Sequence, residues 1–342
     1  MEKSKALLDT LWKRGREFLG VEYPILGGAM SWISEAKLVS AISNAGAFGV
    51  IAGGNMPPEM LVDEIKKTYD LTDKPFGVNL ITIAPNFRKH LDNILKLEHP
   101  YIVFAGGLPP RDAIAQVKQT NSKLICFAPN VSIAEMLVRI GADALVIEGS
   151  EAGGHIGPVS TSVLAEQILP TIRKVPVFAA GGIATGRLMM HFLMMGASGV
   201  QLGTRFAVAE ESIAHPNFKQ TMIKAKAKDA VPTAQFDPRL PVIPVRALIN
   251  GSTRDFNTLQ LGLIQQIERS VISAREAAEE LEKFWIGGLK KAAIDGDVER
   301  GSLMAGQSVG LVNKIEPVAD IIASMVADAI DEADKIMKIT CN

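Results

Sequence analysis

Short apolar runs alternate with amphipathic segments between residues 23 and 204 of this 342-residue chain. A strand of a parallel sheet is covered on both faces and reads as a continuous apolar run, so the alternation predicts repeated strand–helix units. The sequence predicts eight strands, which begin near Tyr23, Ala47, Phe76, Tyr101, Lys123, Asp143, Val175 and Gly199. Helical spacing of apolar residues predicts helices over residues 34–44, 57–69, 86–97, 110–119, 132–140, 162–173 and 185–195.

Eight such units favour an α/β fold of the TIM (β/α)8 barrel class. An open doubly wound sheet stays the alternative, because periodicity does not report whether the first and last strands pair. The chain shows no obvious switch point of the kind that an open sheet requires.

The alternation of apolar runs and amphipathic segments ends after residue 204, which predicts an appended, mainly helical lobe. Helices are predicted over residues 210–229, 259–269 and 273–283, with a loop after the first that contains Pro232, Pro238, Pro241 and Pro244. Residues 301–312 are rich in glycine and small residues, like an active-site loop, and residues 318–337 predict a closing helix. We therefore expect a barrel domain over residues 1–209 and 300–342 and a substrate or lid lobe over residues 210–299.

Composition excludes several classes of partner. Lys and Arg number 36 against 37 Asp and Glu, so no basic surface for nucleic acid or for an anionic membrane is expected. The N-terminal segment is a charged amphipathic helix without a signal-peptide pattern, and no apolar run is long enough to span a membrane, which predicts a cytoplasmic protein. Cys126 lies in an apolar run and Cys341 in the tail, so neither a disulfide framework nor a cysteine metal site is predicted.

Glycines follow most of the apolar runs, at the rim where a barrel of this kind carries its site. Gly181 and Gly182 end strand seven and precede a helix, while Gly203 and Thr204 end strand eight. Backbone N–H groups and a helix N-terminus at these positions predict a phosphate-binding site, to which the Thr204 hydroxyl can add a donor. Tight strand–helix turns are the alternative explanation for these glycines.

The segment EGSEAGGHIG after strand six carries a histidine, His155, between glycines in a polar loop. An imidazole there can exchange a proton near neutral pH, so His155 is the candidate catalytic residue. Glu148 and Glu151 of the same segment can orient His155 or contact a cofactor hydroxyl. A structural role is expected for the other histidines, which are His90 and His99 beside a surface helix, His191 and His215. Their spacing predicts no metal site.

Three motifs, GADALVIEGSEAGGHIG, PVFAAGGIATGR and GASGVQLGTRFAVAEES, resemble the superfamily of nitronate monooxygenases and flavin-dependent enoyl-acyl-carrier-protein reductases. The resemblance runs from YPILGGAMSWIS to GSLMAGQSVGLV and implies FMN at the barrel mouth, with His155 beside the flavin. The residues that it implies for FMN are Gly28, Ala29, Met30, Asn79, Glu148, Gly153, Gly154, Ala180, Gly181, Gly182, Gly203, Thr204, Met304, Gly306 and Gln307.

Two activities in this superfamily share the barrel, the flavin and the histidine. Residues 53–55, 215–219, 252–256 and 296–307 resemble the reductase branch, which takes hydride from NADH or NADPH and reduces an acyl-carrier-protein thioester. The loop FAGGLP after strand four departs from that branch, so a nitronate monooxygenase that uses O2 stays the alternative. A non-redox barrel enzyme is disfavoured because no predicted strand ends in a lysine. A homodimer through the lobe is a further expectation.

Overall fold

A computed structural model describes residues 2–240 and 243–340, so Pro241 of the predicted loop and Cys341 lie outside the described residues. Eight parallel strands form one sheet in the order β1-β9-β8-β6-β5-β4-β3-β2. A parallel bridge between Leu26 and Phe48 joins the two ends of that order, so the sheet closes and the alternative of an open sheet is wrong. The strands are β1 (Ile25–Gly27), β2 (Gly49–Ala52), β3 (Phe76–Ile81), β4 (Tyr101–Ala105), β5 (Lys123–Phe127), β6 (Ala144–Glu148), β8 (Val177–Ala180) and β9 (Gly199–Leu202).

Helices follow the strands and cover the outside of the barrel. They are α3 (Ala36–Asn44), α4 (Pro58–Leu71), α5 (Phe87–Lys96), α6 (Arg111–Lys118), α7 (Val131–Ile140), α8 (Thr161–Ile168), α9 (Gly186–Met194) and α10 (Thr204–Ala207). The prediction for α8 ran on to residue 173, but the helix ends at Ile168 because Pro170 cannot donate a backbone hydrogen bond. The TIM barrel class is confirmed.

Side chains on the two faces of the strands form two apolar layers. Large residues such as Phe48, Val103 and Phe178 fill the barrel interior, and another layer lies between the strands and the surrounding helices. The helices α1 (Glu2–Leu11) and α2 (Lys13–Leu19) precede the barrel, and Leu19 packs into its interior from the N-terminal end. That end is therefore filled, and the opposite end carries the loops in which a site can form.

A second, three-stranded sheet stands over the C-terminal end of the barrel strands, which the sequence did not predict. Its antiparallel strands are β7 (Gly154–His155), β11 (Val245–Leu248) and β10 (Ala230–Pro232), in the order β10-β11-β7. These strands are too short for a two-residue alternation to be recognised in the sequence. The sheet joins the loop after β6 to the segment that follows the barrel.

The appended segment is helical with different bounds from those predicted. The helix expected over residues 210–229 is wrong in its first part, because α11 (Pro216–Lys224) begins at a proline and the residue before a proline disfavours helix. A short 3-10 helix, η1 (Ala227–Asp229), follows it. The other two are longer than expected, as α12 (Gly251–Glu268), which Asn250 caps, and α13 (Ala274–Ala293), which Ser273 caps.

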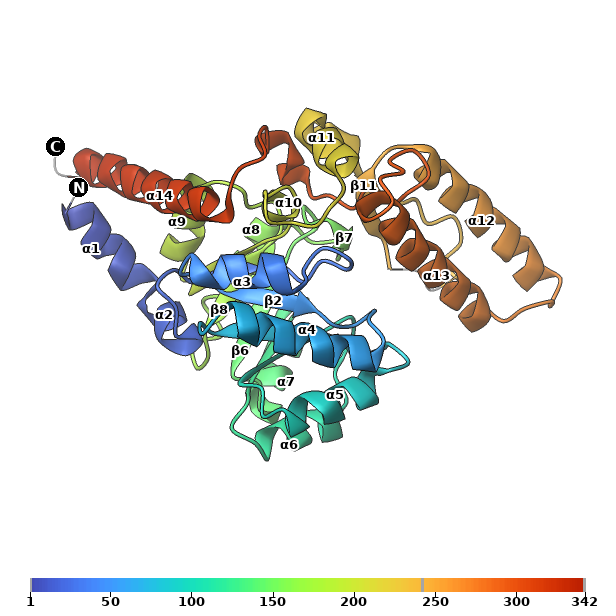
Figure 1. Cartoon of the computed structure of the whole chain (residues 1–342), viewed down its shortest axis with the longest axis horizontal. Coiled ribbons are helices and arrows are strands. Elements are labelled where there is room, and N and C mark those ends of the chain that lie inside the picture. The colour runs from blue at the N-terminus through green and yellow to red at the C-terminus, as the bar shows by residue number, and fades with distance from the viewer. Residues whose placement is uncertain (1, 241–242, 341–342) are drawn as a thin grey trace.

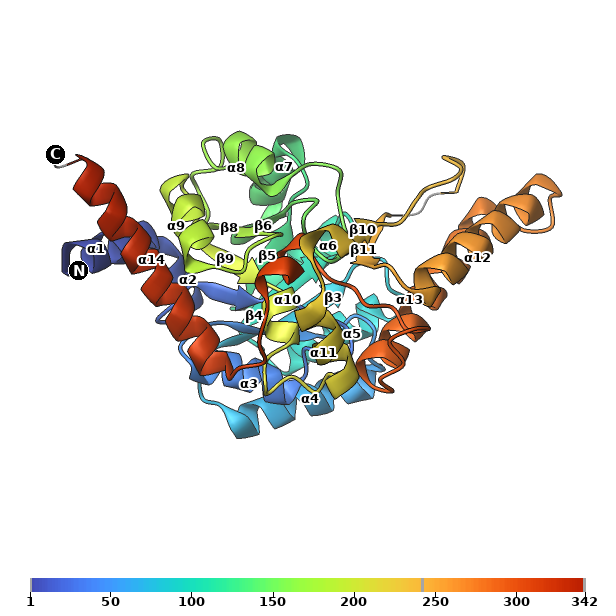
Figure 2. The same cartoon turned by 90° about the horizontal axis from the view of Figure 1, so that it is seen from above.

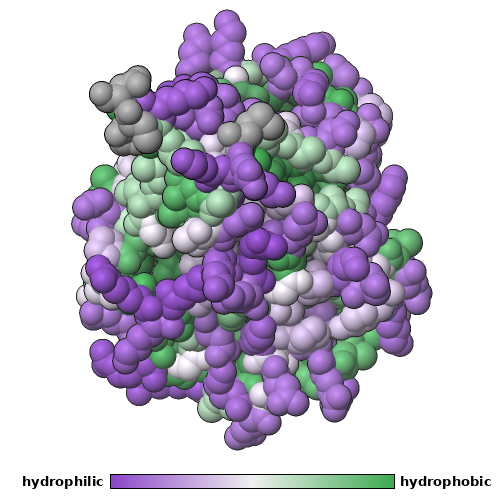
Figure 3. Space-filling model, turned by 90° about the vertical axis from the view of Figure 1, so that its left-hand side faces the viewer, coloured by the Kyte–Doolittle hydropathy of each residue, from purple (hydrophilic) through white to green (hydrophobic). Residues whose placement is uncertain are grey.

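Helices α12 and α13 run side by side away from the barrel, around a separate apolar core that contains Phe256, Leu281 and Trp285 (Figures 1 and 2). The chain then returns through η2 (Gln307–Leu311) to the final helix, α14 (Val318–Thr340), which packs on α9 and α1. Figure 3 shows the face near the two termini, where hydrophilic residues surround scattered hydrophobic ones. No helix in the described part of the chain is long and apolar enough to cross a membrane.

Candidate active site

His155 lies in the short strand β7 rather than in an open loop. Val245 of β11 is its partner in register, and Arg246 is opposite Gly154, whose φ of +79° is a left-handed conformation that favours glycine. The imidazole Nε2 of His155 lies 3.1 Å from Oε1 of Glu282 in α13. The second sheet and a lobe helix therefore hold the histidine between them.

The glycine-rich loop before β7 packs closely on the loop that follows α13. The amide of Gln307 donates to the Glu151 carbonyl at 2.9 Å. A Cβ atom on Gly153 would lie 2.6 Å from the backbone nitrogen of Gly306, so that position requires glycine. The Glu151 carboxylate accepts hydrogen bonds from N and Oγ1 of Thr161 at 2.9 and 3.0 Å. Glu151 thus fixes the start of α8 and is not hydrogen-bonded to His155.

Glu148 ends β6 beside Ala180, its register partner on β8. Burial raises the pKa of the Glu148 carboxyl group to about 7, although the nearby charge of His155 lowers it. Glu148 is thus a titratable group near neutral pH at the mouth of the barrel. Ala180 itself is buried, and its carbonyl accepts from Gly149 N at 3.0 Å.

Two predicted cofactor glycines, Gly28 and Gly203, lie together at the ends of β1 and β9. The Gly28 amide donates to the Leu202 carbonyl at 2.8 Å, and a Cβ on Gly28 would meet that oxygen at an ordinary distance of 3.4 Å. A Cβ on Gly203 would have the Met30 sulfur, 3.9 Å away, as its nearest neighbour. Since no protein atom fills the space before Gly203, the surface there suits a ligand that approaches the backbone.

Gly181 and Gly182 form the turn after β8, with φ angles of +99° and +73°. Both values lie in the left-handed region, which explains the pair of glycines. The helix predicted over residues 185–195 follows this turn. The helix α9 begins at Gly186, because the Thr185 hydroxyl caps it by accepting from Leu188 N.

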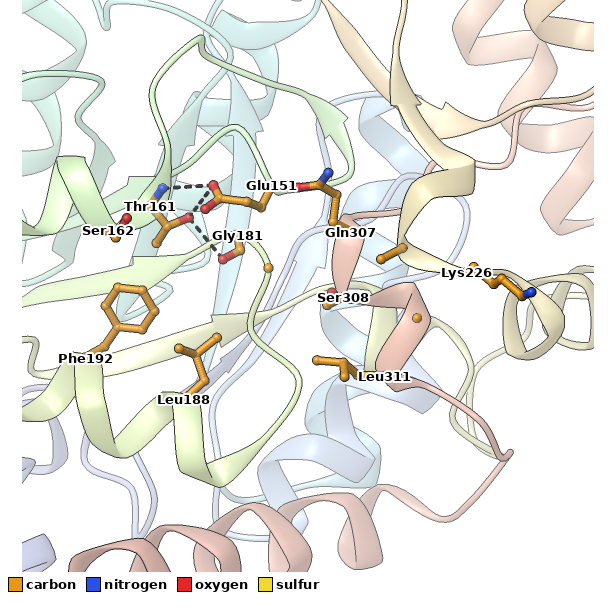
Figure 4. Close-up of a pocket in the computed structure, with 13 residues that line it drawn as sticks. Glu151, Thr161, Ser162, Gly181, Leu188, Phe192, Lys226, Gln307, Ser308 and Leu311 are labelled. Atoms are coloured by element: carbon orange, nitrogen blue, oxygen red, sulfur yellow. Dashed lines mark hydrogen bonds between the residues drawn. The ribbon is translucent and has the colours of Figure 1, made fainter. Parts of the chain in front are cut away.

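A cavity of about 450 Å³ adjoins this turn (Figure 4). Figure 4 shows Glu151, Thr161 and Gly181 joined by hydrogen bonds on one side and Gln307 on the other. Its lining residues come from the turn after β8, the starts of α8 and η2, the helix α9, and η1: Glu151, Thr161, Ser162, Gly181, Gly182, Leu188, Phe192, Lys226, Ala227, Gln307, Ser308, Gly310 and Leu311. The cavity thus brings together three of the predicted cofactor residues, Gly181, Gly182 and Gln307.

The loop before η2 closes over the same end of the barrel. Met304 forms a bridge with Ala247 of β11, and its sulfur would lie 3.5 Å from a Cβ on Gly154. The Gly306 amide donates to Thr204 Oγ1 at 3.0 Å. The Thr204 hydroxyl hydrogen stays available to a ligand, because the oxygen is the acceptor in that bond.

Two predicted cofactor residues lie apart from these contacts. Asn79 is buried on β3, and its Nδ2 lies 3.4 Å from the Val103 carbonyl. Ala29 is exposed on the loop after β1. Both stand at the C-terminal side of the barrel, and neither is hydrogen-bonded to His155 among the described residues.

The other histidines have structural surroundings, although the expected surface position of two of them is wrong. His90 and His99 are buried, with Nε2 of each hydrogen-bonded to a backbone carbonyl, and burial lowers the pKa of His99 to about 4. His191 pairs with Glu332 of α14 at 2.9 Å, and the ring of His215 caps α11. Within the described residues, no group of three or more His, Cys, Asp or Glu side chains could hold a metal ion.

The sequence analysis missed the residues that reach His155 and its loop from the lobe. Glu282 stands 127 positions after His155, and nothing in its local pattern distinguishes it from the other acidic residues of α13. Arg246 is buried, and its Nε donates to the Ser150 carbonyl at 2.9 Å. A buried arginine in a short apolar strand is the one signal that could have indicated a polar partner.

A closed barrel with a glycine-lined mouth, a facing histidine and a lobe over its C-terminal end defines a TIM-barrel enzyme. A family model described as "Nitronate monooxygenase" matches residues 13–88 and 81–328, so the chain belongs to the nitronate monooxygenase family. It is accordingly an oxidoreductase.

Curated relatives and solved structures agree with this assignment. A probable nitronate monooxygenase of Staphylococcus aureus is 32% identical over 67% of this chain and 78% of the relative. A (3aS,4S,5R,7aS)-5-hydroxy-7a-methyl-1-oxo-octahydro-1H-indene-4-carboxyl-CoA dehydrogenase of Rhodococcus jostii is 28% identical over 96% of this chain and 99% of the relative. The structure of FabK from Thermotoga maritima superposes with a TM-score of 0.85 and 36% identity, covering 95% of this chain and 98% of that one.

Proposed function

We propose that this protein is an FMN-dependent enoyl-acyl-carrier-protein reductase that uses NADH or NADPH and acts on an acyl thioester in fatty-acid synthesis. The observation that carries the proposal is the placement of His155 on a sheet that is joined to the glycine-lined mouth through Gly154 and Met304. The likeness to FabK favours the reductase over the monooxygenase. A carboxyl-CoA dehydrogenase among the relatives supports a thioester as the class of substrate.

The residues present fit FMN. The open space before Gly203 and the left-handed turn at Gly181 and Gly182 would admit a phosphate, with the Thr204 hydroxyl as a donor. Gly28 and Met30 would lie beside the ring, and Met304 and Gln307 would cover it. When bound, FMN would supply hydride transfer from the nicotinamide to the substrate.

His155 is the proposed proton donor. Reduction of an enoyl thioester adds one hydride to the β-carbon and one proton to the α-carbon, so NAD(P)H and one proton are consumed for each double bond. His155 would give that proton and regain one from solvent, while Glu148 supplies a second titratable group near neutral pH. The lobe, residues 210–299, would exclude water from the mouth as a lid. Cytoplasmic location and a homodimer through the lobe stay predictions.

Nitronate oxidation is the second candidate, because the matching family model and the Staphylococcus aureus relative carry that name. In that reaction the nitronate would deliver electrons to the flavin and O2 would remove them, without a nicotinamide. His155 would then act as a base toward the substrate.

Anaerobic flavin reduction separates the two candidates. The purified protein is titrated with NADH and with NADPH in one cuvette and with an alkyl nitronate in another, and flavin absorbance is followed. We expect bleaching by a nicotinamide and recovery of colour on addition of a crotonyl thioester. Bleaching by the nitronate alone would show the monooxygenase instead, and a preparation that binds no flavin would contradict both.

A further inference from the structure

The lobe helix α13 brings a carboxylate to the candidate catalytic histidine. Oε1 of Glu282 lies 3.1 Å from Nε2 of His155, and the two side chains are 36% and 43% exposed. Among the described residues, the Nδ1 atom of the same ring has no hydrogen-bond partner. One ring nitrogen is therefore held by the lobe while the other stays free.

The apolar core of the lobe fixes the positions of both His155 and Glu282. Val245, the register partner of His155, belongs to the apolar core of the lobe together with Leu281 and Trp285 of α13. Glu282 follows Leu281 directly, so the burial of that leucine places the carboxylate at the edge of the lobe core. The separation of the two side chains thus depends on the docking of α13 over β11.

The helix α13 is also anchored to the barrel mouth. Lys290 Nζ lies 5.4 Å from the ring centroid of Trp32, in the loop after β1, which is a cation–π distance. The Ser302 amide donates to the Gly288 carbonyl at 2.8 Å. These contacts join the helix that carries Glu282 to the loops on both sides of the candidate site.

The charged groups around His155 come from three elements. Glu282 approaches from α13. Glu148 lies at the end of β6, close enough for its charge to interact with that of His155. Arg246 neighbours His155 across β7 and β11, but its guanidinium is bound to the carbonyls of Ser150 and Ala230. Two carboxyl groups and one already-bound cation thus surround the ring, and of these Glu282 is the one hydrogen-bonded to it.

We propose that Glu282 is a positioning residue for His155. By accepting the Nε2 proton, the carboxylate fixes the orientation and tautomer of the ring, so that Nδ1 faces the substrate and exchanges its proton. Proton delivery would then require the docked position of the lobe, because undocking α13 removes the carboxylate. This inference rests on the proposed function in one respect only, the role of His155 as the proton donor.

The test compares Glu282→Gln with Glu279→Gln in the flavin-containing protein. Glu279 lies on the same helix and forms an ion pair with the exposed Arg275, so its variant controls for loss of one negative charge from α13. For Glu282→Gln we expect a kcat with a crotonyl thioester about 10–100-fold lower, as for other residues that orient a functional histidine, with unchanged KM and flavin content. Glu279→Gln should match the wild type.

A second measurement does not depend on turnover. The nitrogen resonances of the His155 ring, identified by their absence in His155→Ala, show by NMR which ring nitrogen carries the proton in the neutral ring. We expect the proton on Nε2 in the wild type and in Glu279→Gln, and a mixture of the two tautomers in Glu282→Gln, because the carboxylate that accepts the Nε2 proton is gone. An unchanged tautomer in Glu282→Gln would overturn the pairing.

The two measurements keep the inference separate from the proposed function. If His155→Ala turns over at the wild-type rate, the assignment of the proton donor fails, while the NMR measurement of the tautomer still decides whether Glu282 holds the ring. If His155→Ala is inactive but Glu282→Gln keeps the wild-type kcat, the positioning role of Glu282 is wrong.

Discussion

The Cβ position of Gly203 faces open space, with the Met30 sulfur 3.9 Å away as its nearest neighbour beyond the adjoining residues. Its φ of −106° is open to any L-residue, so backbone strain does not explain the glycine. Gly182 differs, because its φ of +73° and a Cβ position 3.0 Å from the Glu151 side chain both restrict it. Gly203 thus leaves room for a ligand, whereas Gly182 is a glycine that the fold requires.

Gly203→Asp is the substitution that tests this distinction. A carboxylate in that space would oppose the FMN phosphate by volume and by charge, so we expect FMN to bind at least about tenfold more weakly, equivalent to about 1.4 kcal/mol. The melting temperature of the flavin-free protein should stay close to the wild type, since no protein atom is displaced. Flavin content after purification and a fluorescence titration with FMN measure the effect.

Gly262→Asp is the matched control, because a Cβ on Gly262 in α12 would meet no atom within 4 Å and α12 lies away from the barrel mouth. Full FMN occupancy in Gly203→Asp would contradict the assignment of this surface to the cofactor.

Parallel strands end at a common edge of the sheet. This arrangement buries the Glu148 carboxyl group and so determines its pKa. The carboxyl group follows the buried run of β6 and stands beside β8, where burial raises its pKa from the ordinary value of 4.5 to about 7. A titratable group of this kind marks a functional site more often than it contributes to stability. The strand end, rather than the residue alone, creates that environment.

Stability should therefore fall as pH rises from about 4.5 to about 7, because the folded state keeps a proton on Glu148 that the unfolded state has released. The penalty is fully present above pH 7 and amounts to about 3 kcal/mol at most. Glu148→Gln does not titrate, so its melting temperature should exceed that of the wild type at pH 8 and converge with it near pH 4.5. Differential scanning calorimetry at several pH values measures this.

The exposed Glu166 of α8 provides the control, and Glu166→Gln should follow the wild type at every pH. A difference between Glu148→Gln and the wild type that does not vary with pH would contradict the raised pKa.

Arg205 connects parts of the whole molecule that are far apart in sequence. Its guanidinium, only 13% exposed, donates to the Ala184 carbonyl before α9, to Glu316 at 3.1 Å and to Ser324 of α14 at 2.9 Å. The final helix is thus tied to the turns that follow β8 and β9. The C-terminal part of the chain stabilises the end of the barrel that carries the candidate site.

Arg205→Met should lower the free energy of unfolding by about 1.5–3 kcal/mol, because it removes one of the two cations that pair with the buried Glu316 carboxylate, the other being Lys314. Urea denaturation measures the loss. Arg187→Met removes the ion pair of the exposed Arg187 of α9 with Glu332 of α14, which keeps its contact with His191, and we expect it to cost less than about 1 kcal/mol. Equal losses of unfolding free energy in the two variants would show that the pair of Arg205 with Glu316 contributes no more than a surface ion pair.

Local patterns in the sequence predicted the strand–helix units of the barrel and the resemblance to the family. Continuous apolar runs such as those around Phe76 and Val177 are local, and so are the glycines that end them, because a buried parallel strand and a left-handed turn each restrict the residues at their own positions. The motif around His155 was recognisable for the same reason. These features required no knowledge of which distant residues meet.

The tertiary structure decided whether the sheet closes, through Leu26 and Phe48, and what surrounds His155. The strands of the second sheet are too short to produce a periodic pattern, and Glu282 reaches the histidine across 127 positions. The pKa of Glu148 likewise follows from burial by neighbouring strands. Contacts of this kind depend on packing between separate elements, and packing leaves no local pattern in the sequence from which a partner could be predicted.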